Sequence, residues 1–432
     1  FNTRISLREE SFPLEGVMMK ESFSNLESFL LKYTGIRELN LSFNVTLRNR
    51  KITETFKQNG KLDNKSVLIR SMNKFKFWRN FITGDLFYEA STQSTSKLEK
   101  VFVRVAKGEG NYRYLGDLNN NGIADEEEFI PDPYDGDYIL VQVPTSELFP
   151  VVNLKTSTRW KVNFASLLKK KRSFWSTILK PVSTETVLRL DEYTEDNDIV
   201  SVLMLKPSIL MNDSTTLRGA NSFQQDFYLF KNKPDLSFRF RYLQNNKLTK
   251  YNSGNERAHF IERSLRIRFR MVKEISNQTD LINQTDNVDT EINNFRARQL
   301  NINNLVSDFS YRPVQSIEVG FKFSYGRSVD NLPSKPTILD NNSQLIRFTF
   351  SFANKGRLRL EAERNEVSDN GTTNDIPFEM LRGNVIGNNY FWRVNFDYRI
   401  AKNLQITLNY NGRRQGEGRI VHNMRSEARA YF

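Results

Sequence analysis

One stretch of the chain carries oxygen-bearing side chains at the spacing of a calcium-binding loop. Residues 117–128 fit the pattern D-x-[DN]-x-[DN]-G-x5-E in every required position. Gly122 allows the sharp turn that such a loop needs. The predicted ligands are the side chains of Asp117, Asn119, Asn121, Asp125 and Glu128, together with the backbone carbonyl of Ile123. The chemistry predicted here is the binding of Ca2+, with Glu128 closing the site through two oxygens.

The composition of this loop sets the affinity and the role that we expect. Asn at two ligand positions lowers the negative charge, which predicts a weak site suited to extracellular calcium at roughly millimolar concentration. The flanks, Tyr112–Tyr114 and 130–133, do not read as helices. We expect the ion to have a structural role, because this segment has little apolar surface to bury. The alternative is an Asn-Gly turn followed by a solvated acidic run.

No second motif predicts chemistry. The chain has no Cys and only two His, so thiol chemistry is excluded and a His-based metal site or triad is not expected. It contains no GxSxG, P-loop or HExxH pattern. The acid pair Glu361 and Glu363 alternates with Arg and reads as solvated or ion-paired. We therefore predict that the protein is not an enzyme.

The elements around the loop are predicted to be amphipathic strands. The clearest lie between Asn389 and Phe432, where apolar and polar residues alternate over about ten residues, as membrane-spanning strands require. One apolar row there is Tyr390, Trp392, Val394, Phe396 and Tyr398. No run approaches the roughly 18 apolar residues of a transmembrane helix. The 33 Phe and 16 Tyr suit strands and interfacial aromatic girdles.

The lengths of the connections give independent support for a barrel. Downstream of residue 290, short turns near 312–316, 353–356 and 401–403 alternate with longer links at 326–342 and 366–388. Transmembrane barrels alternate short periplasmic turns with longer outer loops. We predict an all-β, antiparallel transmembrane β-barrel, either partial or part of a larger barrel. The alternative is a soluble or surface-attached β-sandwich, an adhesin or structural module held by calcium, with the aromatic face covered by a second sheet.

The strand at 264–271 predicts a polar lumen. Arg266, Arg268 and Arg270 alternate there with apolar residues, so in a barrel the three Arg face the interior. This predicts a conduit with a bias toward anions. The net charge of +13 is assigned to such faces rather than to a basic patch with interleaved aromatics, so no nucleic-acid partner is expected.

Other segments are expected to interrupt the strands. We predict a short helix over 21–33, a surface loop or interfacial helix at 165–183, a buried strand at 199–205 and a polar loop at 275–293. Three parts follow: 1–106 as N-terminal strands of a larger β assembly, 107–150 as the calcium-loop accessory segment, and 151–432 as barrel strands. The opening at Phe1, without an initiator Met, suggests a mature or truncated piece of a longer secreted protein.

Two sets of short motifs resemble a known group of proteins. They are 108–112, the calcium loop, 137–138 and 144–151 in one set, and 223–227, 238–241, 308–313, 392–393 and 422–432 in the other. Together they resemble the C-terminal part of large, mostly uncharacterised cell-surface proteins of Bacteroidota and Chlorobi-type bacteria. The loop itself resembles dockerin-like and thrombospondin-like calcium modules. The resemblance implies an outer-membrane or cell-surface location and supplies no activity.

The terminal Phe432 resembles the C-terminal signal by which barrel proteins are recognised for insertion, although Ala430 stands where a larger hydrophobic residue is usual. We therefore expect a non-enzymatic outer-membrane barrel protein that acts as a channel, a secretion or transport component, or a surface anchor. Its expected partners are outer-membrane lipid, the barrel-assembly machinery during insertion, and other chains of a surface complex.

Overall fold

The architecture was determined from a computed structural model of the chain. It describes residues 1–432 except 15, 59–62, 119, 123, 125, 146–148, 169–173, 197, 252–253, 292–296, 353–354, 372–375 and 431–432, and except the side chains of residues 94 and 199. Among the described residues, no helix is long and apolar enough to cross a bilayer.

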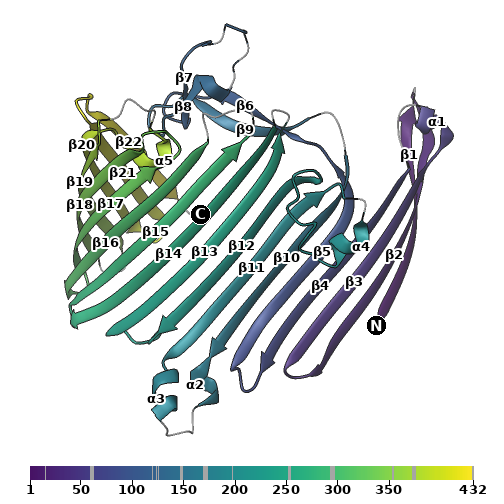
Figure 1. Cartoon of the computed structure of the whole chain (residues 1–432), viewed down its shortest axis with the longest axis horizontal. Coiled ribbons are helices and arrows are strands. Elements are labelled where there is room, and N and C mark those ends of the chain that lie inside the picture. The colour runs from purple at the N-terminus through teal and green to yellow at the C-terminus, as the bar shows by residue number, and fades with distance from the viewer. Residues whose placement is uncertain are drawn as a thin grey trace.

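One antiparallel sheet of eighteen long strands forms the body of the described chain (Figure 1). The strands are β1 (Asn2–Leu14), β2 (Val17–Ile36), β3 (Leu39–Ile52), β4 (Asn64–Phe77), β5 (Ile82–Thr95), β10 (Phe149–Asn163), β11 (Val182–Thr194), β12 (Thr216–Leu229), β13 (Leu236–Tyr251), β14 (Gly254–Val272), β15 (Ile275–Thr290), β16 (Arg298–Val314), β17 (Ile317–Asp330), β18 (Thr337–Phe352), β19 (Gly356–Asp369), β20 (Gly387–Ala401), β21 (Leu404–Gln415) and β22 (Val421–Ala430). Each pairs with the next one named. The predicted all-β antiparallel fold class of the barrel type is confirmed.

Four short strands interrupt this series between β5 and β10. They are β6 (Leu98–Arg104), β7 (Tyr112–Tyr114), β8 (Phe129–Pro131) and β9 (Tyr138–Pro144), with a 3-10 turn at Glu126–Glu128. β6 pairs with β9, and β7 pairs with both β8 and β9. Because β5 pairs directly with β10, the four strands form an insertion at the end of the sheet, which we call the cap (residues 98–144) and which joins the sheet through the pairing of Leu98 with Tyr251 on β13. It lies above β13–β16 in Figure 1.

The sheet curls but does not close in the described part of the chain. β1 pairs only with β2, and β22 pairs only with β21. In Figure 1 the sheet runs from β1 at the right across the front, turns at the left, and ends with β20–β22 behind. β1 and β22 therefore leave two free edges, as expected for a partial barrel.

The two ends of the sheet differ in their connections. One end carries short turns, including 37–38, 273–274, 315–316 and 402–403, which we call the short-turn end. The opposite end, which we call the mouth, carries the cap and the links that contain α1 (Glu54–Gln58), α4 (Ile199–Leu203) and α5 (Phe378–Leu381). The exception is the link at 164–181, which holds α2 (Phe164–Leu167) and α3 (Phe174–Leu179) at the short-turn end (Figure 1).

One face of the sheet is apolar across its width. Phe240, Leu265, Leu281, Leu305 and Tyr325 are successive cross-strand partners from β13 to β17. Among them, Leu281 is 45% exposed and Tyr325 44%. Adjacent large side chains in register account for this, because β-strands send alternate residues to opposite faces. No second sheet covers this face among the described residues, contrary to what the β-sandwich alternative requires.

Three predicted interruptions are wrong. Residues 21–33 are not a helix but belong to β2, since β1 and β3 supply hydrogen bonds on both sides. Residues 275–293 are not a loop, because most of them form β15 between β14 and β16. The segment at 199–205 is not a strand: it begins α4, where the Asp198 carboxylate accepts a hydrogen bond from the Ser201 N–H.

Two small hydrophobic clusters hold the long links against the sheet. The link after β19 packs Met380, Ile376 and Leu381 onto an inner-face cluster of Leu300, Ile302, Leu339 and Val367. The link after β11 packs Val202, Leu203 and neighbours onto Ala90, Val152 and Leu154. These clusters lie toward the mouth, and residues 376–381 consequently cover part of the inner face.

Candidate functional site

The inner face of the curled sheet is lined by charged and amide side chains joined across strands. Asp226 on β12 accepts two hydrogen bonds from Arg241 on β13, at 2.7 and 3.0 Å. Asp226 is almost fully buried. This arrangement fixes the guanidinium against the wall, because a bidentate Arg–carboxylate pair constrains both partners. The inner face is therefore a polar surface with ordered charges.

The arginines of the predicted lumen strand lie on this same face. Arg266 on β14 pairs with Asp280 on β15 at 2.6 Å, and Arg268 donates to the Gln278 side chain at 2.9 Å. Arg266 is thus neutralised by its partner, whereas Arg268 keeps a full positive charge beside a neutral amide. Of these two, Arg268 contributes more to the anion bias predicted from the sequence.

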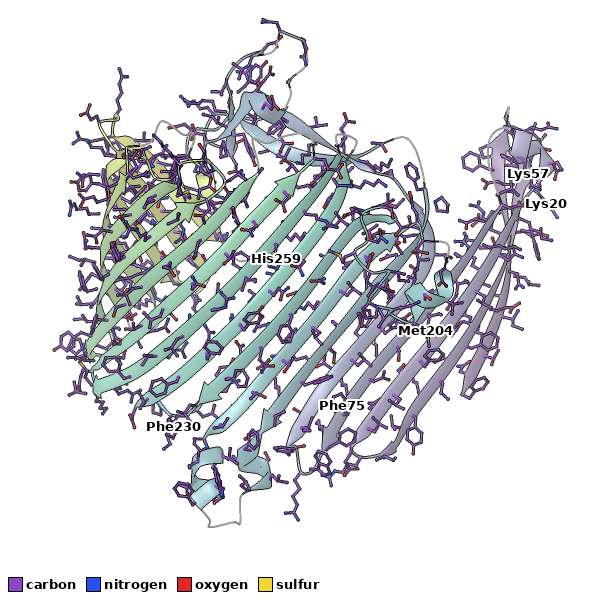
Figure 2. The ribbon with its side chains drawn as sticks, in the orientation of Figure 1. Lys20, Lys57, Phe75, Met204, Phe230 and His259 are labelled. Carbon is purple, nitrogen blue, oxygen red and sulfur yellow. The ribbon has the colours of Figure 1, made fainter. Side chains whose placement is uncertain are left out.

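The opposite, apolar face has the proportions of a lipid-contacting band. On β17 it runs from Ile317 to Tyr325, a length close to the roughly 9–11 residues that a tilted transmembrane strand needs. Aromatic side chains cluster at the short-turn end, including Phe75 stacked on Phe77 at 5.5 Å. Figure 2 shows Phe75 and Phe230 near that end and Lys20 and Lys57 at the opposite end. The sheet is built to span a membrane, with its aromatic girdle at one interface.

Aromatic packing gives the cap a small core of its own. Phe102 stacks on Phe129 with ring centroids 3.8 Å apart, and Tyr114 and Tyr138 pack around Phe129. Phe129 is 1% exposed. Burial and the neighbouring Glu128 carboxylate raise the pKa of Tyr114. The cap is therefore an ordered unit with its own core.

One side of the cap is anchored on β13 and β14. The Lys100 ammonium lies 2.8 Å from a Glu256 carboxylate oxygen and 3.1 Å from one of Glu126. It also lies 4.3 Å from the centre of the Tyr251 ring, and Gln142 donates to the Tyr251 hydroxyl at 3.0 Å. Lys100 is 9% exposed at its side chain, so this charge network is largely desolvated and depends on its partners.

The other side of the cap is anchored on β20 and β21. Arg413 donates to Asp135 at 2.9 Å and stacks over the Tyr134 ring at 4.3 Å. Tyr134 also contacts the Phe391 ring, with centroids 6.0 Å apart. Burial raises the pKa of Tyr134, and the Arg413 charge opposes that shift. Because Glu256, Phe391 and Arg413 are inner-face residues, the cap bridges the mouth from β13–β14 to β20–β21.

Part of the predicted calcium loop can be placed. The carboxylate of Asp117 accepts the N–H groups of Asn121 and Gly122, at 3.2 and 2.9 Å, and Glu128 accepts the Leu118 N–H at 2.8 Å. Gly122 has a φ of +73°, the left-handed conformation that the sharp turn needs. Glu128 is fully buried. The first and last predicted ligands, Asp117 and Glu128, therefore accept hydrogen bonds from the described part of the loop backbone.

The remaining predicted ligands Asn119, Ile123 and Asp125 lie outside the described residues. Within the part of the chain that the structure describes, no group of three or more His, Cys, Asp or Glu side chains is placed to hold a metal ion. The prediction of calcium binding by Asp117, Asn119, Asn121, Ile123, Asp125 and Glu128 stays a prediction.

The anchors of the cap were not identified from the sequence. Lys100 and Glu256 are 156 residues apart, and Arg413 and Asp135 are 278 apart. Each looks like an ordinary strand charge or loop charge. The sequence offers one hint: Asp135 follows the predicted calcium loop in a segment of distinct composition. This composition distinguishes the segment from the strands but does not show which strands it contacts.

No protein-family model matches this chain, and no curated protein matches it significantly. Several solved structures are similar to it. The siderophore receptor PirA from Acinetobacter baumannii matches with a TM-score of 0.41 and 9% identity over 94% of this chain and 64% of that one. OccK11 (OpdR) from Pseudomonas aeruginosa matches with a TM-score of 0.37 and 10% identity over 100% and 93%. Outer-membrane expressed OmpT of Vibrio cholerae matches with a TM-score of 0.32 and 7% identity over 83% and 100%. The chain thus spans less than two thirds of the siderophore receptor.

Proposed function

We propose that the chain is a non-enzymatic outer-membrane protein of the β-barrel type and acts as a capped conduit or transport component. The observation that carries this proposal is the division of one sheet into an apolar outer face and a charged inner face, with the cap bridging the mouth. A solute that follows the inner face meets ordered charges along the wall and the cap at the mouth. In this orientation the short turns face the periplasm and the mouth faces outward.

The free edges of β1 and β22 indicate that the sheet pairs with further strands. Unpaired backbone N–H and C=O groups are costly in hydrocarbon, so an open sheet edge does not persist in lipid. We propose that further strands, from another segment or another chain, pair with β1 and β22 and complete the barrel. Lipid against the apolar face, and the assembly machinery during insertion, are the other proposed partners.

We also propose that calcium binds the loop at 117–128 and stiffens the cap. The support comes from the hydrogen bonds that Asp117 and Glu128 accept from the loop backbone. Glu126, in the same 3-10 turn as Glu128, joins the Lys100–Glu256 anchor. An ion bound to Glu128 would therefore stabilise the same turn that carries Glu126, the residue that helps to fix the cap to β14.

Membrane partition tests the central proposal. The chain is expressed with a secretion signal and fractionated, and the outer-membrane pellet is run on a gel with and without boiling. The expected result is a detergent-extracted band whose mobility changes on heating, because folded barrels resist unfolding at room temperature. A chain that stays folded in the soluble fraction without detergent would contradict the proposal, because the apolar face would then need an aqueous partner.

A further inference from the structure

An arginine-rich cavity lies on the inner face at the short-turn end. Its volume is about 350 Å³. Four strands and the turn between β16 and β17 contribute its walls. The lining residues are Arg312, Gln315, Ser316, Glu318, Arg347, Thr349, Ser351, Arg357 and Arg359. Four guanidinium groups therefore face one carboxylate across a small polar space.

Three carboxylates, Asp308, Glu318 and Glu361, pair with three of these four arginines. Glu318 is shared between Arg312 at 2.8 Å and Arg347 at 3.4 Å. Arg359 pairs with Glu361, which lies outside the cavity lining and also pairs with Arg393. Arg357 is exposed and makes no ion pair among the described residues. Four arginines against these three carboxylates leave an excess of one positive charge, carried by Arg357, which a small anion would balance.

One glycine shapes the cavity. A Cβ atom at Gly320 would lie 2.7 Å from the Arg347 guanidinium, so the missing side chain lets Arg347 lie flat across β17. From there Arg347 reaches Asp308 on β16 at 3.4 Å as well as Glu318. Arg347 is thus held in place before any ligand arrives, which lowers the entropy cost of binding.

We propose that this cavity binds a small phosphate-bearing solute. Guanidinium groups present planar N–H forks that match phosphate oxygens, and the hydroxyls of Ser316, Thr349 and Ser351 add donors. The cavity opens on the charged face rather than on the apolar one, which favours a dissolved phosphate over a lipid headgroup. Its assignment to the periplasmic side rests on the proposed function, whereas the binding itself does not.

Calorimetric titration of inorganic phosphate tests the proposal, using the whole folded chain in zwitterionic detergent at low salt. Arg357→Gln is the informative variant, because Arg357 has no ion pair to lose and the fold is expected to be unaffected. We expect its affinity for phosphate to fall about tenfold, as for the loss of one charge-assisted hydrogen bond. Arg268→Gln is the matched control, an inner-face arginine beside a neutral amide, and we expect less than a twofold change.

Two further variants separate a built site from diffuse charge. Glu318→Gln frees Arg312 and Arg347 and is expected to tighten phosphate binding, whereas Gly320→Ala displaces Arg347 and is expected to weaken it. Equal losses in Arg357→Gln and Arg268→Gln, or no saturable binding, would overturn the proposal. Glycerol 3-phosphate is expected to compete with phosphate, and competition from anionic phospholipid instead would show a lipid site and also overturn it. Because binding is measured on the folded chain, a failure to conduct ions would leave this result unaffected.

Discussion

At the scale of single residues, carboxylates decide what the inner face and the cap can do. Glu128 is buried inside the calcium loop and Asp226 inside the strand ladder, and each accepts hydrogen bonds that fix its position. A buried carboxylate that loses its partner carries an uncompensated charge, so these positions are sensitive to small changes. The exposed carboxylates of the same segments are not.

The calcium loop can be tested by terbium luminescence, since Tyr114 lies beside Glu128 and can sensitise a bound lanthanide. We expect the unmodified chain to show saturable luminescence that excess calcium displaces. Glu128→Gln, and separately Asp117→Asn, should weaken terbium binding at least tenfold, because each removes charge from a ligand of a hard cation. Glu127→Gln is the control, since Glu127 is exposed and is not a predicted ligand. Equal terbium affinity in all three variants would show that the loop at 117–128 is not the metal-binding site.

The buried ion pair between Asp226 and Arg241 is predicted to stabilise the folded protein. Asp226→Ala leaves Arg241 without its carboxylate, and we expect unfolding in lipid vesicles to become easier by about 3 kcal/mol, the lower range for breaking a buried pair. Glu427→Gln disrupts the exposed pair with Arg429 at 2.7 Å and should leave the denaturant midpoint unchanged. A similar midpoint for Asp226→Ala and the unmodified chain would show that water reaches Arg241 freely.

At the scale of elements, the cap is the part whose position matters most. It is a covalent insertion between β5 and β10, yet its fixed contacts lie on β13–β14 and on β20–β21. The two anchors are both ion pairs supported by a Tyr ring, and neither involves a large apolar interface. The position of the cap therefore depends on a few polar contacts and on the backbone pairing of Leu98 with Tyr251.

Loosening both anchors should expose the inner face. The chain has no Cys, so a single Asn409→Cys on the inner face of β21 gives a clean labelling site. We expect Lys100→Met with Arg413→Gln to speed its reaction with a bulky maleimide added from outside. Lys57→Met with Asn409→Cys is the control, because Lys57 pairs with Glu54 within α1, away from the cap. Unchanged labelling in the double-anchor variant would mean that the cap does not restrict the mouth.

At the scale of the whole molecule, the sheet is a single layer whose two faces differ in polarity. Its outer face is apolar, and its inner face bears the cross-strand ion pairs described above. The described sheet ends in free edges at β1 and β22, where the proposed further strands would pair. The number of strands that close the sheet would set the diameter of the barrel.

A charge added to the apolar face should lower the stability of the protein, whereas a charge added to the inner face should not. Ile346 is 58% exposed in the middle of the apolar band, paired with Phe321 and Ala362. We expect Ile346→Lys to cost about 2–4 kcal/mol, the range for a lysine at the bilayer midplane. Ser324→Lys, on the inner face of β17, should be nearly neutral. Both are measured by denaturant unfolding from lipid vesicles, and equal effects would argue that the apolar face does not meet lipid.

The sequence by itself determined the strand period, the two faces and the turns at the short-turn end. The row of aromatic residues on β20 and the arginines on β14 follow directly from alternation, because side-chain direction in a strand is a local property. It also marked the cap segment, through the composition around the calcium loop. These features need no knowledge of distant residues.

Only the tertiary structure decided that segments without a clear alternation of apolar and polar residues became strands. Residues 275–290 carry Asn, Thr and Asp on both faces and look like a loop, but flanking strands supply hydrogen bonds on both sides, as when Asn283 donates to Asn303 at 2.9 Å. The anchors of the cap and the arginine-rich cavity likewise join residues far apart in the chain. Local propensity cannot encode such contacts, because they form only when the sheet has curled.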